Sequence, residues 1–118
     1  MRGENMEMKY EQRSRALTVT LPPEIDHHSA RPIREEADRW ISKLRPEAVV
    51  IDFSGVRFMD SSGIGLILGR YNKVAPYGGR VVVECADRRT LQLLRLAGVQ
   101  KLVEIRSAAD QPRGKERI

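Results

Sequence analysis

The order of apolar and polar residues changes its period several times along the chain, and each period predicts one kind of element. From Ala16 to Leu21 apolar and polar residues alternate, which predicts a half-buried strand. Pro22 and Pro23 follow directly and should end this strand, because proline has no N–H to donate to a ladder. We expect an earlier strand near Met8–Gln12 to pair with it.

The stretch that follows has the period of a helix with one apolar side. The residues of that side are Ile33, Ala37, Trp40, Ile41 and Leu44. Ser29 is the predicted N-cap, and Pro32 is tolerated in the first turn, where its missing N–H leaves no helical bond unmade. Pro46 lies just beyond the end of the stripe, as is common after a helix.

Three further apolar runs predict buried strands, and two helices lie between them. The runs are Ala48–Ile51, Arg80–Glu84 and Leu102–Ile105. One helix should begin at Ser61 or Ser62 and end at Val74. The other should begin at about Asp87 and end at Gly98, a natural C′ residue. Strands that alternate with helices of this length predict an α/β fold with a mixed, mostly parallel sheet packed by helices.

The length and composition are typical of one soluble domain. The chain has 118 residues, of which 41% are hydrophobic and 31% charged, and it shows no internal repeat or low-complexity linker. We therefore expect a single domain over residues 1–118, with its core at about 8–105. Residues 106–118 form a tail that we expect to be short helix or disordered, because it has no apolar stripe.

The net charge of +5 does not by itself indicate a nucleic-acid partner. Lys and Arg are scattered and aromatic residues make up only 5% of the chain, whereas nucleic-acid binding favours clustered basic residues with aromatics between them. No apolar run is long enough to span a bilayer, and the N-terminus lacks the apolar region of a secretion signal. The one cysteine, Cys85, cannot form an intramolecular disulfide. We expect a cytoplasmic protein that binds neither nucleic acid nor membrane.

The segment with the most chemical information runs from Asp52 to Gly65, where a buried strand gives way to a helix. Asp60, Ser61 and Ser62 are all good capping residues, so helix capping accounts for one of them. Capping does not account for two glycines in the first turn, Gly63 and Gly65, since each costs about 1 kcal/mol relative to alanine in a helix interior. We infer that something approaches the backbone closely there.

The helical period predicts where that approach occurs. The inward side should be formed by Ile64, Ile67, Leu68, Tyr71 and Val74. The outward side should then be formed by Ser62, Gly65, Leu66, Gly69 and Lys73. A smooth and partly apolar face of this kind is suited to docking the backbone of another protein. The alternative is that the glycines pack under a loop of the same domain.

Three enzyme hypotheses have weaker support. The spacing of Gly63, Gly65 and Gly69 is one residue too long for the dinucleotide-binding fingerprint. A hydrolase triad could combine Ser61 with His27 or His28 and Asp26, but the motif of a nucleophile elbow is absent. A metal site at Asp26-His27-His28 would lack a third and fourth ligand nearby.

The segment Phe58–Val74, FMDSSGIGLILGRYNKV, resembles the phosphorylation-site helix of the bacterial anti-sigma-factor antagonists, which are single STAS domains. A second block, Glu24–Ala30, is similar to an acidic and histidine-containing block in sporulation members of that family. Gly78-Gly79, the strand up to Glu84, and Leu94–Val103 follow the end of the family pattern more loosely. The resemblance covers about residues 8–105.

The resemblance implies a role for each matching residue. Ser61 matches the serine that a kinase phosphorylates, and Asp26 matches an acidic residue beside that site. The remaining matched or flanking positions, which we expect to contact the partner, are Asp60, Ser62, Gly63, Gly65, Leu66 and Gly69. The implied partners are an anti-sigma factor that is a serine kinase and a metal-dependent serine phosphatase. The protein would have no cofactor, metal or catalytic residue of its own and would be a monomer when free.

Two departures from the family pattern and one alternative function remain. Pro23 stands where the family usually has glycine, and the tail lacks the apolar period of the family's last helix. A STAS domain could also serve a different partner, in a stress-signalling or transporter-associated complex. The resemblance favours an antagonist in the regulation of a sigma factor, switched off by phosphorylation of Ser61.

Overall fold

The structure is a computed structural model that describes residues 6–107. Its main sheet has the strand order β1-β2-β4-β6-β7. These strands are β1 (Glu7–Glu11), β2 (Ala16–Thr20), β4 (Ala48–Asp52), β6 (Arg80–Ala86) and β7 (Glu104–Ser107). Strand β1 is antiparallel to β2, whereas the other neighbours are parallel. The predicted α/β fold with a mixed, mostly parallel sheet is therefore confirmed.

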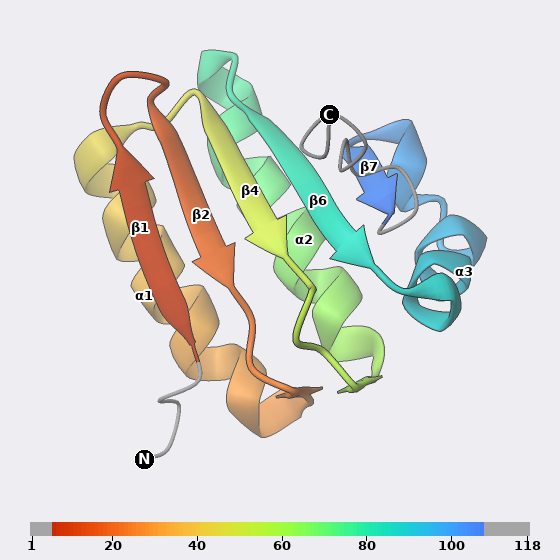
Figure 1. The fold of residues 1–118 in the computed structure, drawn as a ribbon. Coiled ribbons are helices and arrows are strands. Elements are labelled where there is room, and N and C mark those ends of the chain that lie inside the picture. Colours follow the sequence, from red (N-terminus) through yellow and green to blue (C-terminus); the bar gives the residue numbers. More distant parts are fainter. Residues whose placement is uncertain (1–5, 108–118) are drawn as a thin grey trace, which may run out of the picture.

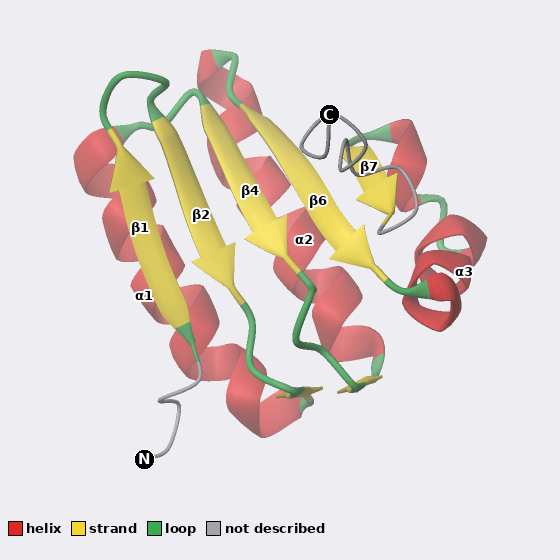
Figure 2. Ribbon diagram, in the orientation of Figure 1, coloured by secondary structure: helices red, strands yellow, loops and turns green. Residues whose placement is uncertain are grey.

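Two long helices cover one face of this sheet, α1 (His27–Leu44) and α2 (Ser61–Val74) (Figure 1). A third helix, α3 (Arg88–Leu96), lies beside β6 and β7 (Figure 2). The 3-10 turns η1 (Ala75–Tyr77) and η2 (Val99–Lys101) follow α2 and α3. The core lies between the sheet and the helices, because alternate residues of β2, β4 and β6 point toward the helices and are buried.

The paired strands have the registers that their apolar alternation requires. Leu17 of β2 lies opposite Val49 of β4, which in turn lies opposite Val81 of β6, and all three side chains are buried. The predicted strand near Met8–Gln12 is present as β1. The last strand begins later than predicted, at Glu104, and it continues into the expected tail as far as Ser107. The remainder of that tail, 108–118, lies outside the described residues.

Helix α1 begins earlier than predicted. Its N-cap is Asp26, whose Oδ1 accepts the N–H of Ser29 at 2.9 Å. Ser29 instead occupies the third helical position, and its hydroxyl oxygen accepts the N–H of Asp26 at 3.0 Å. Both Asp and Ser are good N-caps, and the capping box of Asp26 satisfies two backbone donors at once. The predicted cap was therefore wrong by three residues.

Helix α2 has the predicted limits, but its buried side is rotated from the prediction. The buried residues are Gly63, Leu66, Ile67, Arg70 and Val74. Leu66, expected on the outward face, is only 3% exposed, whereas Leu68, expected inside, is half-buried. The rotation has a physical reason: α2 packs against α1 as well as against the sheet, so Leu66 and Arg70 turn toward α1.

The buried Arg70 is paired with Asp38 of α1. Arg70 is 4% exposed, and its Nε lies 2.9 Å from Oδ1 of Asp38 in an ion pair that lacks the alignment of a hydrogen bond. Nη2 of Arg70 donates to Oδ2 of Asp38 at 3.3 Å, and Nη1 donates to the carbonyl oxygen of Leu66 at 3.4 Å. Burial lowers the pKa of Arg70 and the charge of Asp38 opposes that shift. This pair fixes the two helices side by side.

Candidate functional site

A small second sheet brings the beginnings of α1 and α2 together. It consists of β3 (Glu24–Ile25) and β5 (Phe58–Met59), which pair in parallel. The carbonyl oxygen of Pro23 accepts the N–H groups of Arg57 at 2.7 Å and of Phe58 at 3.1 Å. The two short strands lie below the carboxyl ends of β2 and β4 in Figure 1. Pro23, the departure from the family pattern, thus contributes its carbonyl oxygen to this connection.

Asp26 and Asp60 lie next to each other at the end of this small sheet. The N–H of Asp60 donates to the carbonyl oxygen of Ile25 at 3.0 Å, which places Asp60 beside the residue that follows Ile25. Each aspartate is the N-cap of its helix, and Oδ1 of Asp60 accepts the N–H of Ser62 at 2.7 Å. The structure therefore brings Asp26 close to the predicted phosphorylation segment.

The carboxylate of Asp26 is stabilised by its capping bonds. The N–H of Ser29 is the main cause that lowers the pKa of Asp26, and the N–H of His28, the hydroxyl of Ser29 and the charge of His28 act in the same direction. Asp26 therefore carries a negative charge at neutral pH, beside the N-terminus of α2.

The lowered pKa of Asp26 predicts a stability difference that depends on pH. The native state holds the carboxylate more tightly than the unfolded chain, so this contribution is complete above the ordinary pKa of 3.8 and is lost as the pH falls through the lower native value. Asp26→Asn keeps a capping oxygen but has no charge. The difference in unfolding free energy between the wild type and this variant, measured in urea from pH 7 to pH 3, should shrink below pH 3.8. A difference that stays constant would contradict this prediction.

Ser61 is the first residue of α2, and it begins an exposed row along that helix. We call Ser61, Gly65 and Gly69 the outer row of α2, because each lies one helical turn after the previous one. Ser61 and Gly65 are exposed and Gly69 is half-buried. A Cβ atom added to Gly65 or Gly69 would meet no other atom within 4 Å. The domain itself therefore does not need glycine at either position.

Gly63 is different, because it packs inside the domain. A Cβ atom at this position would lie 2.2 Å from Sδ of Met59, and both residues are buried. Internal packing thus accounts for Gly63, whereas the open space around Gly65 and Gly69 does not favour the alternative that those two glycines pack under a loop of the domain. Gly63 and Leu66, which we expected to contact the partner, are both buried.

Alanine substitutions should separate these glycines by the sign of their effect on stability. Gly65→Ala and Gly69→Ala should each raise the free energy of unfolding by up to about 1 kcal/mol, because they add helix propensity in open space. Gly63→Ala should lower it by about 1–3 kcal/mol, because Met59 must leave its packed position. Urea unfolding of the three variants tests this, and equal effects at all three positions would contradict it.

Two apolar side chains near the outer row, those of Phe58 and Leu68, are not fully buried and were not among the predicted contact residues. Phe58 of β5 is 51% exposed, whereas its neighbour Met59 points inward and is 8% exposed. Leu68 is half-buried, and the helical period places it next to the outer row, on the side of α2 away from Leu66 and Arg70. The alternation of side chains along a strand would have indicated that Phe58 points outward. The strand has only two residues, however, so this pattern cannot be recognised in the sequence without the pairing of β3 and β5.

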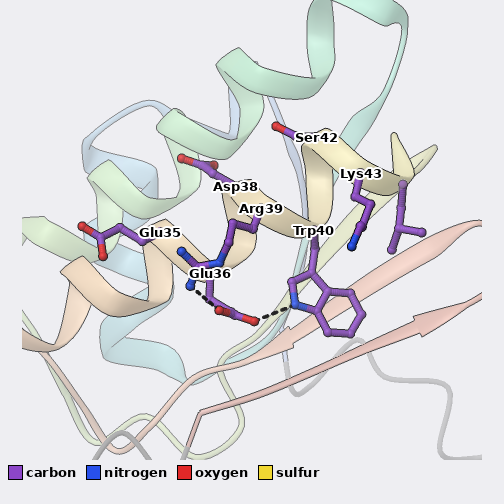
Figure 3. Close-up of a pocket in the computed structure, with 8 residues that line it drawn as sticks. Glu35, Glu36, Asp38, Arg39, Trp40, Ser42 and Lys43 are labelled. Carbon is purple, nitrogen blue, oxygen red and sulfur yellow. Dashed lines mark hydrogen bonds and ion pairs between the residues drawn. The ribbon is translucent and has the colours of Figure 1, made fainter.

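The structure adds no support for the metal-site hypothesis at Asp26-His27-His28. His27 and His28 are exposed, and within residues 6–107 no group of three or more His, Cys, Asp or Glu side chains could hold a metal ion. A surface depression is lined by Glu35, Glu36, Asp38, Arg39, Trp40, Ser42, Lys43 and Leu44 (Figure 3). Those residues all come from the later part of α1, whereas Ser61 lies beside its beginning.

The polar groups in that depression are already paired. Glu36 accepts the indole N–H of Trp40 at 2.9 Å and also binds Arg39 (Figure 3). Arg39, followed by Trp40, lowers the pKa of Glu36. None of the helices in the described part of the chain has the length and apolarity to cross a bilayer.

Comparison with known proteins agrees with this geometry. Residues 7–111 match the STAS domain family. The chain is 34% identical over 101 residues to an anti-sigma F factor antagonist of Paenibacillus polymyxa, covering 86% of each protein. It is 27% identical over 111 residues to an anti-sigma-B factor antagonist of Bacillus subtilis, covering 90% of this chain and 95% of the other.

Solved structures show the same fold. The unphosphorylated form of the anti-sigma factor antagonist SpoIIAA has a TM-score of 0.69 at 24% identity, covering 85% of this chain and 86% of the other. The Bacillus protein in its phosphorylated form has the same TM-score and identity. An anti-sigma factor antagonist from Mycobacterium paratuberculosis has a TM-score of 0.73 at 23% identity, covering 90% and 88%. The chain thus belongs to the STAS domain family and, within it, to the anti-sigma factor antagonists.

Proposed function

We propose that the unphosphorylated protein binds an anti-sigma factor through the outer row of α2 and releases the sigma factor, and that phosphorylation of Ser61 ends this binding. The observation that carries the proposal is the smooth outer row, which begins at an exposed serine and continues with two glycines that meet nothing in the domain. Phe58 and Leu68 add apolar area beside it, and Asp26 and Asp60 add negative charge.

The glycines support a docking role because they are unfavourable for the isolated helix. Gly65 and Gly69 each destabilise α2 by about 1 kcal/mol relative to alanine. A position with open space around it would tolerate alanine, so the fold gives no reason for glycine. A partner backbone that approaches the helix closely gives such a reason, because a side chain at either glycine position would hold it away.

A phosphate on Ser61 would be tolerated by the domain and opposed at the interface. It adds a charge of about −1.5 to −2 at pH 7. At the first residue of α2 this charge meets the positive end of the helix dipole, which favours it. The neighbouring carboxylates of Asp26 and Asp60 make the same surface strongly negative. A partner seated on the outer row would then face added bulk and added negative charge.

The chemistry of the switch would belong to the partners. The anti-sigma factor would be a serine kinase that supplies ATP, Mg²⁺ and the catalytic base, while Ser61 supplies the acceptor hydroxyl. A metal-dependent serine phosphatase would restore the unphosphorylated form. We place this cycle in the cytoplasm, where the sigma factor would act.

Phosphopeptide mass spectrometry tests the assignment of Ser61. After incubation with ATP and the anti-sigma kinase from the same host, we expect stoichiometric phosphate on Ser61 and none in Ser61→Ala. Ser62→Ala is the matched control, because Ser62 is the adjacent hydroxyl and only half-buried. Phosphate on Ser62 in the wild type, or an absence of phosphate with a kinase that binds the protein, would contradict the proposal.

A further inference from the structure

A cavity of about 400 Å³ lies at the end of the fold opposite to Ser61. It is formed where the β1–β2 turn, the end of α1 and the turn between η1 and β6 meet. The lining residues are Arg15, Arg45, Glu47, Tyr77, Gly78, Gly79 and Arg80. Its volume falls within the range of small-molecule sites in proteins, about 300–1,000 Å³. Three guanidinium groups from three separate segments therefore surround one concave surface.

The backbone holds two of these arginines in an uncommon conformation. Arg15 has a φ of 56° and Arg45 a φ of 44°, and within residues 6–107 they are the only residues other than glycine with positive φ. This conformation is disfavoured for arginine, so local contacts must hold it in place. Gly78, with a φ of 91°, and Gly79 form a wall of the cavity without side chains and leave room for a ligand.

Two carbonyl oxygens just beyond the end of α1, those of Arg45 and Pro46, already accept hydrogen bonds and so repel an anion less. Nη2 of Arg15 donates to the carbonyl oxygen of Arg45 at 2.9 Å, and the hydroxyl of Tyr77 donates to that of Pro46 at 2.8 Å. The guanidinium carbon of Arg45 lies 4.4 Å from the centre of the Tyr77 ring. The flat face of the Arg45 guanidinium group therefore contacts the Tyr77 ring. The N–H groups lie in the plane of the guanidinium group and remain available to a ligand.

Two carboxylates partly neutralise the three arginines of the cavity. A ligand would have to displace these carboxylates, so they indicate what kind of anion could bind. Nη1 of Arg15 lies 3.4 Å from Oε2 of Glu47, and Nη1 of Arg80 lies 3.7 Å from Oε1 of Glu104. Both pairs are largely exposed, so they are weak. A ligand with one carboxylate would attract the arginines no more strongly than Glu47 already does. Linked phosphates carry more negative charge, and their oxygens can accept two hydrogen bonds at once from the planar guanidinium group of arginine.

We propose that this cavity binds a small ligand with two or more linked phosphate groups, held by Arg15, Arg45 and Arg80. The site is separate from the outer row of α2, so the proposal does not depend on the function proposed above. Arg45 ends α1, and Gly78 ends the 3-10 turn η1 that directly follows α2, so an occupied cavity would lie at the ends of the two helices whose beginnings hold Asp26 and Ser61.

Titration of the full chain with inorganic triphosphate, followed by calorimetry and by amide chemical shifts, tests this proposal. We expect saturable 1:1 binding with a Kd below about 1 mM, and shift changes at Tyr77, Gly78 and Gly79. Inorganic monophosphate at equal ionic strength should bind at least about tenfold more weakly, because it spans fewer guanidinium groups.

Three variants and one control make the result specific. Arg45→Asn retains a residue that tolerates positive φ, and Arg80→Gln leaves the β6 backbone unchanged; each should weaken binding by about tenfold or more. Glu47→Gln removes the competing carboxylate and should strengthen binding severalfold. Arg89→Gln removes an equal charge from the exposed surface of α3 and should leave the Kd unchanged.

Each other outcome overturns the proposal. An absence of saturation would mean that the arginines serve only to cap the helix end. An equal loss of binding in Arg89→Gln would indicate diffuse attraction to a basic chain. Unchanged or weaker binding in Glu47→Gln would show that the ligand does not use Arg15. Shift changes centred on Ser61 would place the anion at the start of α2 instead.

Discussion

Replacement of Asp38 by alanine is expected to destabilise the protein by about 3 kcal/mol, the largest effect on stability that we predict for a single exchange. The removal of one partner from a buried ion pair typically costs about 3–5 kcal/mol, because the other charge stays buried and unpaired. We expect the lower end of this range, because the Asp38 side chain is 26% exposed and water can partly replace it near Arg70.

The double variant Asp38→Leu with Arg70→Met shows whether the loss comes from the unpaired charge. Apolar residues of similar volume often replace a buried ion pair without loss of stability, so the double variant should recover most of the 3 kcal/mol. Glu35→Ala is the matched control on α1, since it breaks the exposed pair with Arg31 and should change stability by at most about 0.5 kcal/mol. Urea unfolding measures all three, and an Asp38→Ala effect no larger than that of Glu35→Ala would contradict the prediction.

The pair of Asp38 and Arg70 also shows where sequence analysis of α2 failed. Helical periodicity favours apolar residues on the inward side, so the predicted inward side did not include Arg70, and Leu66 was placed on the outward side. The pairing residue lies 32 positions earlier in the chain. No local pattern connects the two, and the inward side of α2 could therefore be predicted only in part.

Strands β2, β4 and β6 and the start of α2 were predictable because their signals are local. Continuous apolar runs define β4 and β6, proline ends β2, and the capping residues at 60–62 define the start of α2. The adjacency of Asp26 and Asp60 came from the family resemblance, because it depends on the pairing of two strands of only two residues each. The different surroundings of Gly63 and Gly65 were also hidden, since both are glycines in one helical turn and only the folded structure shows what lies near each of them.

The second large effect concerns partner binding, and it follows from the open space around the outer row. Gly65→Gln and Gly69→Gln should each weaken binding of the anti-sigma factor by at least about 100-fold, because the added side chain holds the partner backbone away from α2. A 100-fold change in Kd corresponds to about 2.8 kcal/mol. The fold should not suffer, since a Cβ atom at either position meets nothing within 4 Å and glutamine favours a helix more than glycine does.

Ser42→Gln is the control for this experiment, because it makes a similar enlargement at an exposed position in the later part of α1. Calorimetric titration with the anti-sigma factor should give the same Kd for Ser42→Gln as for the wild type. The alanine variants at Gly65 and Gly69 should lie between the wild type and the glutamine variants, because a single methyl group separates the two backbones less. If the glutamine variants bind within threefold of the wild type, the outer row is not the docking surface. If they lose binding only together with stability, the glycines serve the fold. A loss of binding with the stability preserved is the result that assigns these two glycines to the partner.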